Sequence, residues 1–427
     1  MTRPFSYRRT PSGWVDTRLR AVVSRRRESG RPDLPLLSVN LPNGVVPRRD
    51  GDGRPAPAED LSGYQVVHPG DVVMNQLGKP HGAIGASPHL GIISPAYFVA
   101  GVAPTAEPTF LHYLLRTRLY ISEYERRGKF MPPSQFDISW DQFRLIEVTL
   151  PPLDEQRAIA DFLDTETARI DALITKKRRL IELLDERYHD VVRHGVSGLL
   201  TGVERRVPSS VPWMADRPDS WDEAMLKLVA DLGTGHTPSR EHPEWWVDCT
   251  IPWVTTGEVS QMRSDRLETL TTTRERISAL GLANSSAVLH PAHTVVLCRT
   301  AASAGYSAIM GVDMATSQDI VTWTCGLLLR PRFLLLCLRA MRGDLLGRLA
   351  MGSTHKTIYM PDVESIRVPL PPVEEQDRIV EAVWSRLRVV GGTVDRLHRQ
   401  IELLVEHRQA LITAAVTGEL EIPRVAA

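Results

Sequence analysis

The amino-acid sequence contains the same unit twice, and an internal repeat constrains the architecture of a chain more than any single motif does. Three short motifs recur with one common offset of 220 residues. They are LPPLDEQ at 150–156 and LPPVEEQ at 370–376, IELL at 181–184 and 401–404, and VSG at 196–198 and VTG at 416–418. Such a duplication implies a pseudo-symmetric molecule, although two duplicated domains do not by themselves reveal a function.

Weaker matches extend the repeat upstream. Pro11-x-x-Trp14 matches Pro218-x-x-Trp221 at an offset of 207, so the spacing drifts and each copy has a variable globular part before its constant part. The variable parts contain short β-branched runs between turns rich in glycine and proline, such as HTVVLCR at 293–299. These runs predict many short strands and a mixed α+β class.

The constant part of each copy is predicted to be one long helix. Pro151-Pro152 and Pro371-Pro372 are helix-start signals, because proline fits the first turn, and the acidic residues that follow suit the positive end of the helix dipole. A helix of about 43 residues is roughly 60 Å long. Gly198 and Gly418 stand where each helix is expected to end.

Apolar residues recur along both helices in steps of three and four, a period of 3.5 residues that indicates a coiled coil. These stripes consist of Leu163, Ile170, Ile174, Ile181 and Leu184 in the first copy and Val383, Leu387, Val394, Leu397, Ile401 and Leu404 in the second. We expect the helices to pack antiparallel within the chain, with the globular parts at opposite ends, because that arrangement is self-complementary. Each helix could instead pair with a partner protein. Gly391-Gly392 predicts a kink or weak point, since a mid-helix glycine costs about 1 kcal/mol relative to alanine.

The predicted fold class is therefore α+β, with two pseudo-repeated globular domains joined by two long helices packed as an antiparallel coiled coil. The predicted parts are a first globular domain at 1–149, the first helix with its linker at 150–206, a second globular domain at 207–369 and the second helix at 370–427.

The net charge is zero, with 51 basic and 51 acidic residues, which argues against a protein that coats nucleic acid nonspecifically and leaves local basic surfaces open. Lysine and arginine contact phosphates, whereas arginine, asparagine, glutamine, serine and threonine read base edges. The candidate DNA contacts are Arg25, Arg26, Arg27, Arg48, Arg49, Gly235, Thr237, Ser239, Arg240, Arg299 and Ser303. Each has a simpler explanation, because arginine runs are usually solvated loops and glycines usually form turns.

Motifs of catalysis are missing from the sequence. It has no G-x-x-x-x-G-K-[ST] phosphate loop, which excludes an ordinary motor, and no Asn/Asp-Pro-Pro-aromatic segment for methyl transfer to an amino group. It also has no G-x-S-x-G and no cluster with metal-ligand spacing. We therefore expect no catalysis and no cofactor or metal bound by this chain.

The four cysteines form no C-x-x-C pair, and the sequence MTRPFSYRRT at the N-terminus has no apolar signal region. The most apolar stretch, 326–338, is interrupted by charged residues and is too short to span a bilayer. We expect a cytoplasmic protein with reduced thiols and no membrane partner.

The order of a globular unit, an LPP-x-x-EQ helix, a second globular unit and a second LPP-x-x-EQ helix resembles the specificity subunits of type I restriction-modification systems. The resemblance covers nearly the whole chain. It is strongest in LPPLDEQRAIADFLD (150–164) and LPPVEEQDRIVEAV (370–383), and further similar segments are LLSVN to GVVPRRD (36–50), PGDVVMNQL (69–77), GIISPAY (91–97), PWMADRPDSW (212–221), GTGHTPSR (233–240), IPWVTTGEV (251–259) and GSTHKTI (352–358). Unit two departs at Pro291-Ala292-His293, where unit one has Pro-Gly-Asp.

This resemblance implies a non-catalytic DNA-recognition subunit. Each globular unit would be a target recognition domain for one half of a bipartite site in double-stranded DNA, and the helices would set the spacing, near one helical turn or roughly 34–36 Å. The helices would also dock two modification subunits that bind S-adenosylmethionine and methylate adenine, with restriction subunits that use ATP and Mg²⁺ as further partners. The alternatives are a coiled-coil adaptor between proteins without DNA specificity and an enzyme that acts on nucleic acid directly.

Overall fold

The structure is a computed structural model that describes residues 11–40, 43–49, 56–75, 77–78, 83–131, 135–200, 202, 205–349 and 357–422. Its contacts divide the chain into two units. Unit 1 consists of Met1–Lys177 and Arg399–Ala427, and unit 2 consists of Arg178–His398. Each unit therefore combines one globular head with part of both long helices. The bounds of the four parts predicted from the sequence stay predictions.

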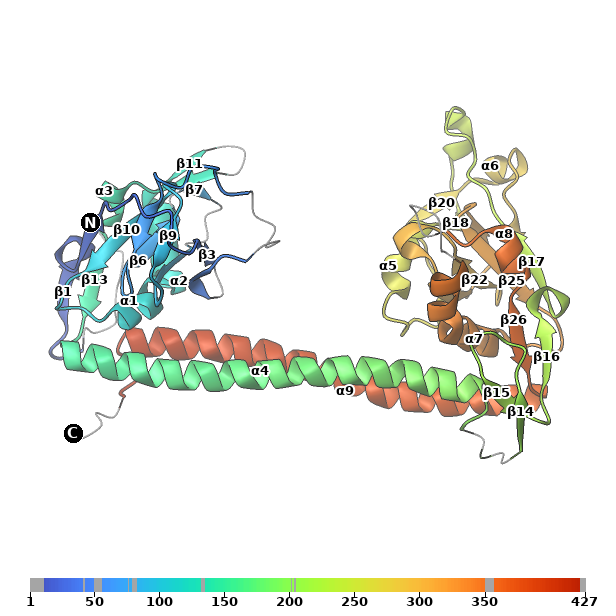
Figure 1. Ribbon diagram of the computed structural model, residues 1–427. Helices are drawn as coiled ribbons and strands as arrows, with labels where there is room; N and C mark the ends of the chain where they lie inside the picture. Colours follow the sequence, from blue (N-terminus) through green and yellow to red (C-terminus); the bar gives the residue numbers. More distant parts are fainter. Residues whose placement is uncertain are drawn as a thin grey trace. The chain divides into compact units, whose positions relative to one another are not determined.

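Two long helices dominate the secondary structure, α4 (Leu153–Val196) and α9 (Val373–Val416), each of 44 residues (Figure 1). Both begin after a Pro-Pro pair with acidic residues in the first turn, as predicted. α9 is helical through Gly391 and Gly392, and the kink or weak point expected there stays a prediction. The packing of a long amphipathic face supplies more helix stability than two glycines remove. In the described part of the chain, no helix is both long and apolar enough to cross a membrane.

The head of unit 1 is built from short antiparallel strands. The strands are β1 (Val15–Arg18), β2 (Val23–Arg26), β3 (Leu37–Asn40), β4 (Gly44–Pro47), β5 (Gln65–Val67), β6 (Val72–Asn75), β7 (Leu77–Gly78), β8 (Ile84–Ala86), β9 (Gly91–Ile93), β10 (Tyr97–Val102), β11 (Lys129–Met131), β12 (Gln135–Asp137) and β13 (Glu147–Leu150). The main sheet has the order β2-β10-β6-β8, and β1 pairs with β13, β3 with β4 and β5 with β9, while β11, β12 and β7 form a three-stranded sheet. The helices are α1 (Pro108–Leu115), α2 (Arg118–Arg127) and α3 (Trp140–Phe143), with a 3-10 turn at Leu19–Ala21. One apolar core joins this sheet, α1 and both long helices.

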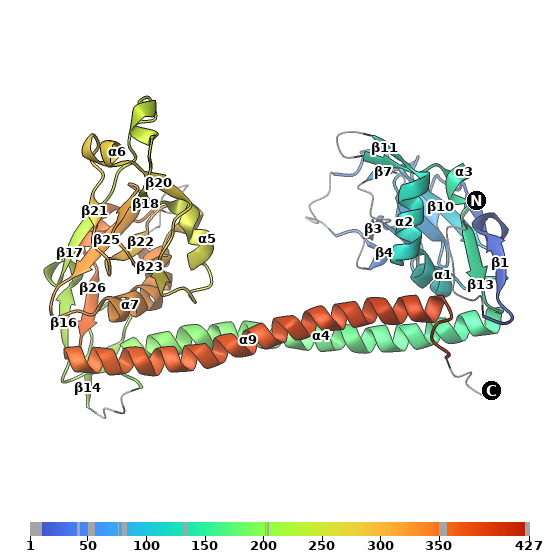
Figure 2. The same cartoon turned by 180° about the vertical axis from the view of Figure 1, so that it is seen from behind.

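The head of unit 2 has two larger sheets. Its strands are β14 (Arg206–Pro208), β15 (Asp216–Pro218), β16 (Asp222–Met225), β17 (Ala230–Thr234), β18 (Ile251–Val254), β19 (Thr269–Leu270), β20 (Glu275–Ile277), β21 (Leu289–His290), β22 (Val295–Cys298), β23 (Ser307–Met310), β24 (Met314–Thr316), β25 (Ile320–Cys325) and β26 (Arg367–Leu370). The sheet orders are β17-β25-β22-β23-β19 and β20-β18-β24-β21, and the pairs are β14 with β15 and β16 with β26. The helices are α5 (Val259–Met262), α6 (Ala279–Ala283), α7 (Pro331–Asp344) and α8 (Met360–Glu364), with 3-10 turns at Leu226–Leu228, Pro243–Trp246, Thr256–Glu258 and Ala301–Ser303 and a π turn at Leu345–Leu349. In both views α7 lies beside the long helices of its unit (Figures 1 and 2), and its buried face shares their core.

Within unit 1 the start of α4 packs against the end of α9. Asp171 forms an ion pair with Arg408 at 3.1 Å, and Nζ of Lys177 donates to Oε1 of Gln400 at 2.7 Å. Residue numbers rise along one helix while they fall along the other, so the two segments run antiparallel. Within unit 2, a side chain at Gly195 of α4 would collide with Val383 of α9. Glycine there lets the two backbones approach closely.

The glutamine of each LPP-x-x-EQ motif fastens a head to its helix. In unit 1, Gln156 accepts a hydrogen bond from the main-chain N–H of Glu107, the N-cap of α1, at 2.8 Å and donates to the Pro151 carbonyl at 2.9 Å. In unit 2, Gln376 accepts from the N–H of Arg330, the N-cap of α7, at 2.9 Å and donates to the Pro371 carbonyl at 2.8 Å. Both side chains are fully buried. The repeated motif thus makes the same local connection in each unit.

The glycine that ends each long helix also has matching surroundings. Gly198 has a φ of +76° and its α-carbon lies against Pro218 and Trp221 of unit 2. Gly418 has a φ of +74° and lies against Pro11 and Trp14 of unit 1. A left-handed backbone and a tight neighbour both favour glycine at these positions.

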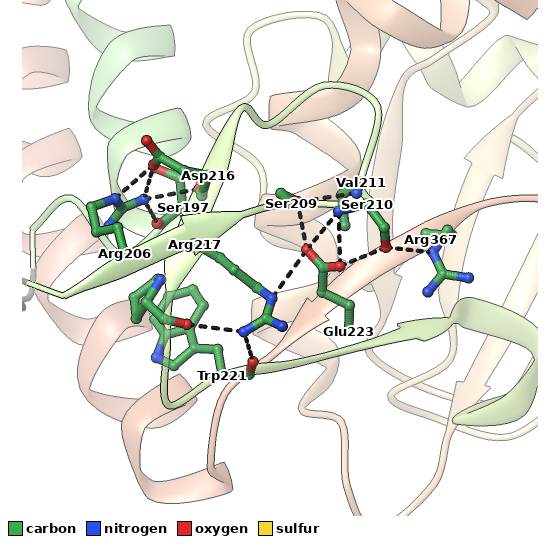
Figure 3. A network of polar contacts seen from close by, with 11 residues as sticks. Ser197, Arg206, Ser209, Ser210, Val211, Asp216, Arg217, Trp221, Glu223 and Arg367 are labelled. Carbon is green, nitrogen blue, oxygen red and sulfur yellow. Dashed lines mark hydrogen bonds and ion pairs between the residues drawn. The ribbon is translucent and has the colours of Figure 1, made fainter.

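The connection from α4 into the second head is held by a network of polar contacts (Figure 3). Arg206 donates to the main-chain oxygen of Ser197 at the end of α4 and to Asp216 across the β14–β15 pair. Glu223 accepts from the N–H of Ser210 at 2.9 Å and from the Ser209 hydroxyl. Burial alone would raise the pKa of Glu223, but these bonds outweigh it and hold the pKa below its usual value. The carboxylate of Glu223 therefore stays charged and holds the segment between β14 and β15 in place.

Candidate nucleic-acid interface

Of the three arginines predicted at 25–27, Arg25 and Arg26 are neighbours in β2, so their side chains point to opposite faces of the strand. Arg26 forms a two-bond ion pair with Asp71, with Nε to Oδ2 at 2.8 Å and Nη2 to Oδ1 at 3.0 Å, and this pairing raises the pKa of Arg26. The Asp71 side chain is only 3% exposed, and it also accepts from the N–H of His68. Arg26 thus neutralises a buried carboxylate. Arg25 has a buried Nε without a hydrogen bond among the described residues, and Arg27 is exposed.

Arg48 and Arg49 follow β4, at the edge of the described part of the first head. The N–H of Arg48 donates to the Leu36 carbonyl at 2.8 Å, and Arg49 is exposed. Residues 50–55 lie outside the described residues, as do residues 352–356 of the GSTHKTI segment.

In unit 2 the structure brings Gly235, Thr237 and Arg299 together around the turn between β24 and β25. Gly235 lies so close to the Thr316 main chain that no side chain would fit there. Oγ1 of Thr237 donates to Oε1 of Gln318 at 2.8 Å, and Nε of Arg299 donates to the main-chain oxygen of Gln318 at 3.0 Å.

Gln318 was missed by the sequence reasoning, although it joins two predicted residues. A comparison of the two sequence repeats could have pointed to Gln318. SQDI at 317–320 precedes β25 as SPAY at 94–97 precedes β10, so the two heads differ at this turn in the residue after serine.

Ser239 and Arg240 lie apart from this cluster, in the loop that leads to the 3-10 turn at Pro243–Trp246. The guanidinium of Arg240 stacks 4.4 Å from the ring centre of Trp246 and pairs with Glu275 at 3.1 Å. The Trp246 Nε1 donates to the Ser239 carbonyl at 3.1 Å. The charge of Arg240 is thus partly neutralised, although its side chain is exposed. Ser303 is half-buried in its own 3-10 turn.

A buried ion cluster outside these candidates fastens the second head to α4. The carboxylate of Asp265 accepts two bonds from Arg342 at 2.6 and 2.7 Å, and its main-chain oxygen accepts from Arg339 and from the Tyr188 hydroxyl of α4. Burial raises the pKa of Tyr188 to about 12. Arg339 and Arg342 are therefore paired with Asp265 inside the protein and are not available for contacts with DNA.

Burial is the main cause of the pKa shifts of one histidine and three cysteines in the two heads. Burial lowers the pKa of His112 in α1 to about 4, with a further contribution from the charge of Arg116. Burial raises the pKa of Cys298 and Cys337, and that of Cys325 to about 12, so these thiols stay protonated. A protonated buried thiol is a poor nucleophile.

Comparison with known proteins finds similarity to one family. Residues 218–387 match the family model described as "Type I restriction modification DNA specificity domain". The MjaX type I restriction enzyme specificity subunit of Methanocaldococcus jannaschii is 21% identical over 391 residues, which cover 85% of this chain and 81% of that protein. The EcoR124I/EcoR124II specificity subunit of Escherichia coli is 23% identical over 188 residues, or 42% of this chain and 45% of its own length. The chain thus spans less than half the length of that relative.

Two solved structures share the fold over nearly the whole chain. A chain from a structure on complex assembly and conformational transition of the type I R-M system has a TM-score of 0.69 at 19% identity and covers 96% of this chain and 100% of its own. The HsdS subunit from Thermoanaerobacter tengcongensis has a TM-score of 0.55 at 20% identity, with 97% and 99% covered.

Proposed function

We propose that this chain, a member of the family of type I restriction-modification specificity subunits, selects the DNA sequence on which such a complex acts. Each head would read one half of a bipartite site. The observation that carries this proposal is the repeated glutamine connection, because Gln156 and Gln376 fasten two heads to two equivalent helix starts in the same way. A molecule with two such heads can bind two separated half-sites in one duplex.

The long helices would act as the spacer between the half-sites. We propose that α4 and α9 form one antiparallel coiled coil along their whole length. The predicted apolar stripe supports this, because all of its residues are buried or half-buried, including Leu163, Ile174, Val383 and Leu397. A rigid pair of helices would fix the distance between the heads and thereby the number of base pairs between the half-sites.

The outer faces of the helices would dock two modification subunits. The IELL motif occurs in both helices, and its third residue is exposed in each, Leu183 at 44% and Leu403 at 56%. Equivalent exposed leucines on two copies of one motif suit two copies of one partner. The partners would bind S-adenosylmethionine, and ATP with Mg²⁺ if a restriction subunit joins. The chain itself would bind no cofactor and catalyse no reaction, and it would work in the cytoplasm, where its DNA lies.

The test is co-expression of this chain with a modification subunit of its system, followed by mapping of methylated bases in the host genome. We expect methylation of one split motif, and none when either protein is expressed alone. Exchange of residues 14–149 for those of another family member should change only one half of the motif. A complex whose DNA affinity does not depend on salt would support a protein adaptor instead, because release of counterions from phosphates makes DNA binding salt-dependent.

A further inference from the structure

The turn between β24 and β25 carries a polar cluster that is assembled from three separate segments. Gln318 is exposed on this turn, Thr237 follows β17, and Arg299 follows β22. The Thr237 hydroxyl holds the amide oxygen of Gln318 at 2.8 Å, and Nε of Arg299 holds the main-chain oxygen of Gln318 at 3.0 Å. The side chains of Gln318 and Arg299 are therefore held at the same place on the surface of unit 2.

The backbone beneath the cluster is also fixed. The N–H of Arg299 donates to the Asp319 carbonyl at 3.0 Å, and the N–H of Ile358 donates to the Arg299 carbonyl at 2.8 Å. The close approach of Gly235 to Thr316 holds the neighbouring segment. Side chains fixed in this way lose little conformational entropy when they bind a ligand, which favours recognition.

The hydrogen bonds within the cluster leave its recognition atoms available. Among the described residues, none accepts a bond from Nε2 of Gln318 or from the Nη atoms of Arg299. An amide oxygen has two lone pairs, so Oε1 of Gln318 can accept a second bond. An amide with one donor and one acceptor matches N7 and N6 of adenine, and the two Nη atoms of a guanidinium match O6 and N7 of guanine.

The charge of the cluster favours a base edge over a phosphate. Arg299 contributes one positive charge, and Asp319, next to Gln318 on the same turn, contributes one negative charge. A phosphate contact requires a surplus of positive charge, whereas base edges are read by neutral amides and by bidentate arginine.

The first head has different residues at the turn that carries this cluster in unit 2. At the equivalent turn, between β9 and β10, Pro95 stands in the position of Gln318 and Ala96 in that of Asp319. Proline has no side-chain donor or acceptor, so this turn cannot make the same contact. The two heads therefore differ in chemistry at one equivalent place in the fold.

We propose that Gln318 and Arg299 read base edges in the half-site bound by unit 2, Gln318 an adenine and Arg299 a guanine, with Thr237 as a positioning residue for the amide. This inference rests on the proposed function and assigns the specificity of that head to named side chains.

The experiment uses the complete complex with its modification subunit and compares methylation motifs and rates for four variants. Gln318→Ala should lower methylation of the original site about 10- to 100-fold and make one base pair of one half-site degenerate. Gln318→Glu should shift the preference at that pair toward cytosine, because a carboxylate accepts from N4 of cytosine. Arg299→Lys keeps the charge but loses the bidentate contact, so a second pair of the same half-site should relax. Pro95→Ala, the matched control in unit 1, should leave motif and rate unchanged.

The positioning role of Thr237 is tested with a conservative pair. Thr237→Val should relax the same base pair as Gln318→Ala, and Thr237→Ser should restore the original motif. Assembly of every variant with the modification subunit is checked by size-exclusion chromatography, and binding to the original duplex is measured as well as methylation.

Three outcomes would overturn the inference. One is an unchanged motif in Gln318→Ala. A second is an equal loss on all sequences with a shallower dependence on salt, which indicates a phosphate contact. The third is failure of Gln318→Ala to assemble while Gln318→Glu assembles and keeps the original motif, which indicates a structural glutamine. Absence of any split motif with the unmodified chain would refute the proposed function itself, so the two failures are distinguishable.

Discussion

Replacement of the motif glutamine in the second repeat should destabilise unit 2 out of proportion to the size of the change. Gln376 is fully buried, and its side chain donates to the carbonyls of Leu328 and Pro371, both at 2.8 Å, and accepts from the N–H of Arg330 at 2.9 Å. Gln376→Ala leaves three main-chain groups without this partner. An unsatisfied buried group costs roughly 1–3 kcal/mol, and the carbonyls each keep a second lone pair, so we expect a loss of about 3 kcal/mol in the free energy of unfolding.

A loss of that size corresponds to a fall in Tm of roughly 6–12 °C, since about 1 kcal/mol shifts the Tm of a unit of 150–250 residues by 2–4 °C. The assay is thermal unfolding together with hydrogen exchange of the Arg330 amide, which should become measurably faster than in the unmodified chain. Glu374→Ala is the matched control, because Glu374 lies exposed in the same helix turn.

Gln376→Glu sharpens the test, because a carboxylate of nearly the same shape can no longer donate to the two carbonyls. Burial beside these oxygens would raise the pKa of the introduced carboxyl in the folded state above its value in the unfolded state. The folded protein then binds the proton more tightly, so the defect should shrink as the pH falls from 7 to 5. A Tm of Gln376→Ala within 2 °C of the unmodified chain, or a defect of Gln376→Glu that does not change with pH, would refute this reasoning.

Three further predictions follow from buried or open positions. Gly391→Ala and Gly392→Ala should each stabilise the chain by about 0.5–1 kcal/mol in thermal unfolding, because a Cβ at either position meets no atom closer than 3.7 Å; a fall in Tm would contradict this. Asp265→Asn should lower the unfolding free energy of unit 2 by about 3–5 kcal/mol in denaturant titration, because it leaves two arginines without their buried anion while asparagine tolerates the positive φ of 55°. His112, with a pKa lowered to about 4, stays neutral in the folded state while the unfolded chain takes up a proton below about pH 6.5. Stability of unit 1 should therefore fall by roughly 3 kcal/mol between pH 6.5 and pH 4, and His112→Leu should remove most of that dependence.

The large elements of this fold were predictable because they depend on local patterns. Two long helices were predicted from the Pro-Pro pairs at their starts, the apolar stripes along them and the glycines at their ends. The structure places these helices at Leu153–Val196 and Val373–Val416. α9 also continues through Gly391 and Gly392, because helix propensity is a weak preference that tertiary packing overrides.

The candidate contacts were harder to predict, because their surroundings depend on residues far away in the sequence. Arg26 belongs to a three-arginine run, yet its charge is taken by Asp71, 45 residues later. Thr237 and Arg299 were chosen for their chemistry alone, whereas the residue that connects them, Gln318, is 81 and 19 positions away. The DNA contacts therefore stay predictions until variants are tested.

The contact of the last helix with the first head also sets the order in which this protein can fold during its synthesis. The core of unit 1 includes Ile412, Ala415 and Val416, and Gly418 packs against Pro11 and Trp14. The ribosome makes the first head early but supplies these closing residues only after all of Arg178–His398. Unit 2 is drawn from one continuous stretch, Arg178–His398, and can be completed first. The unit whose synthesis begins first is thus the unit that is completed last.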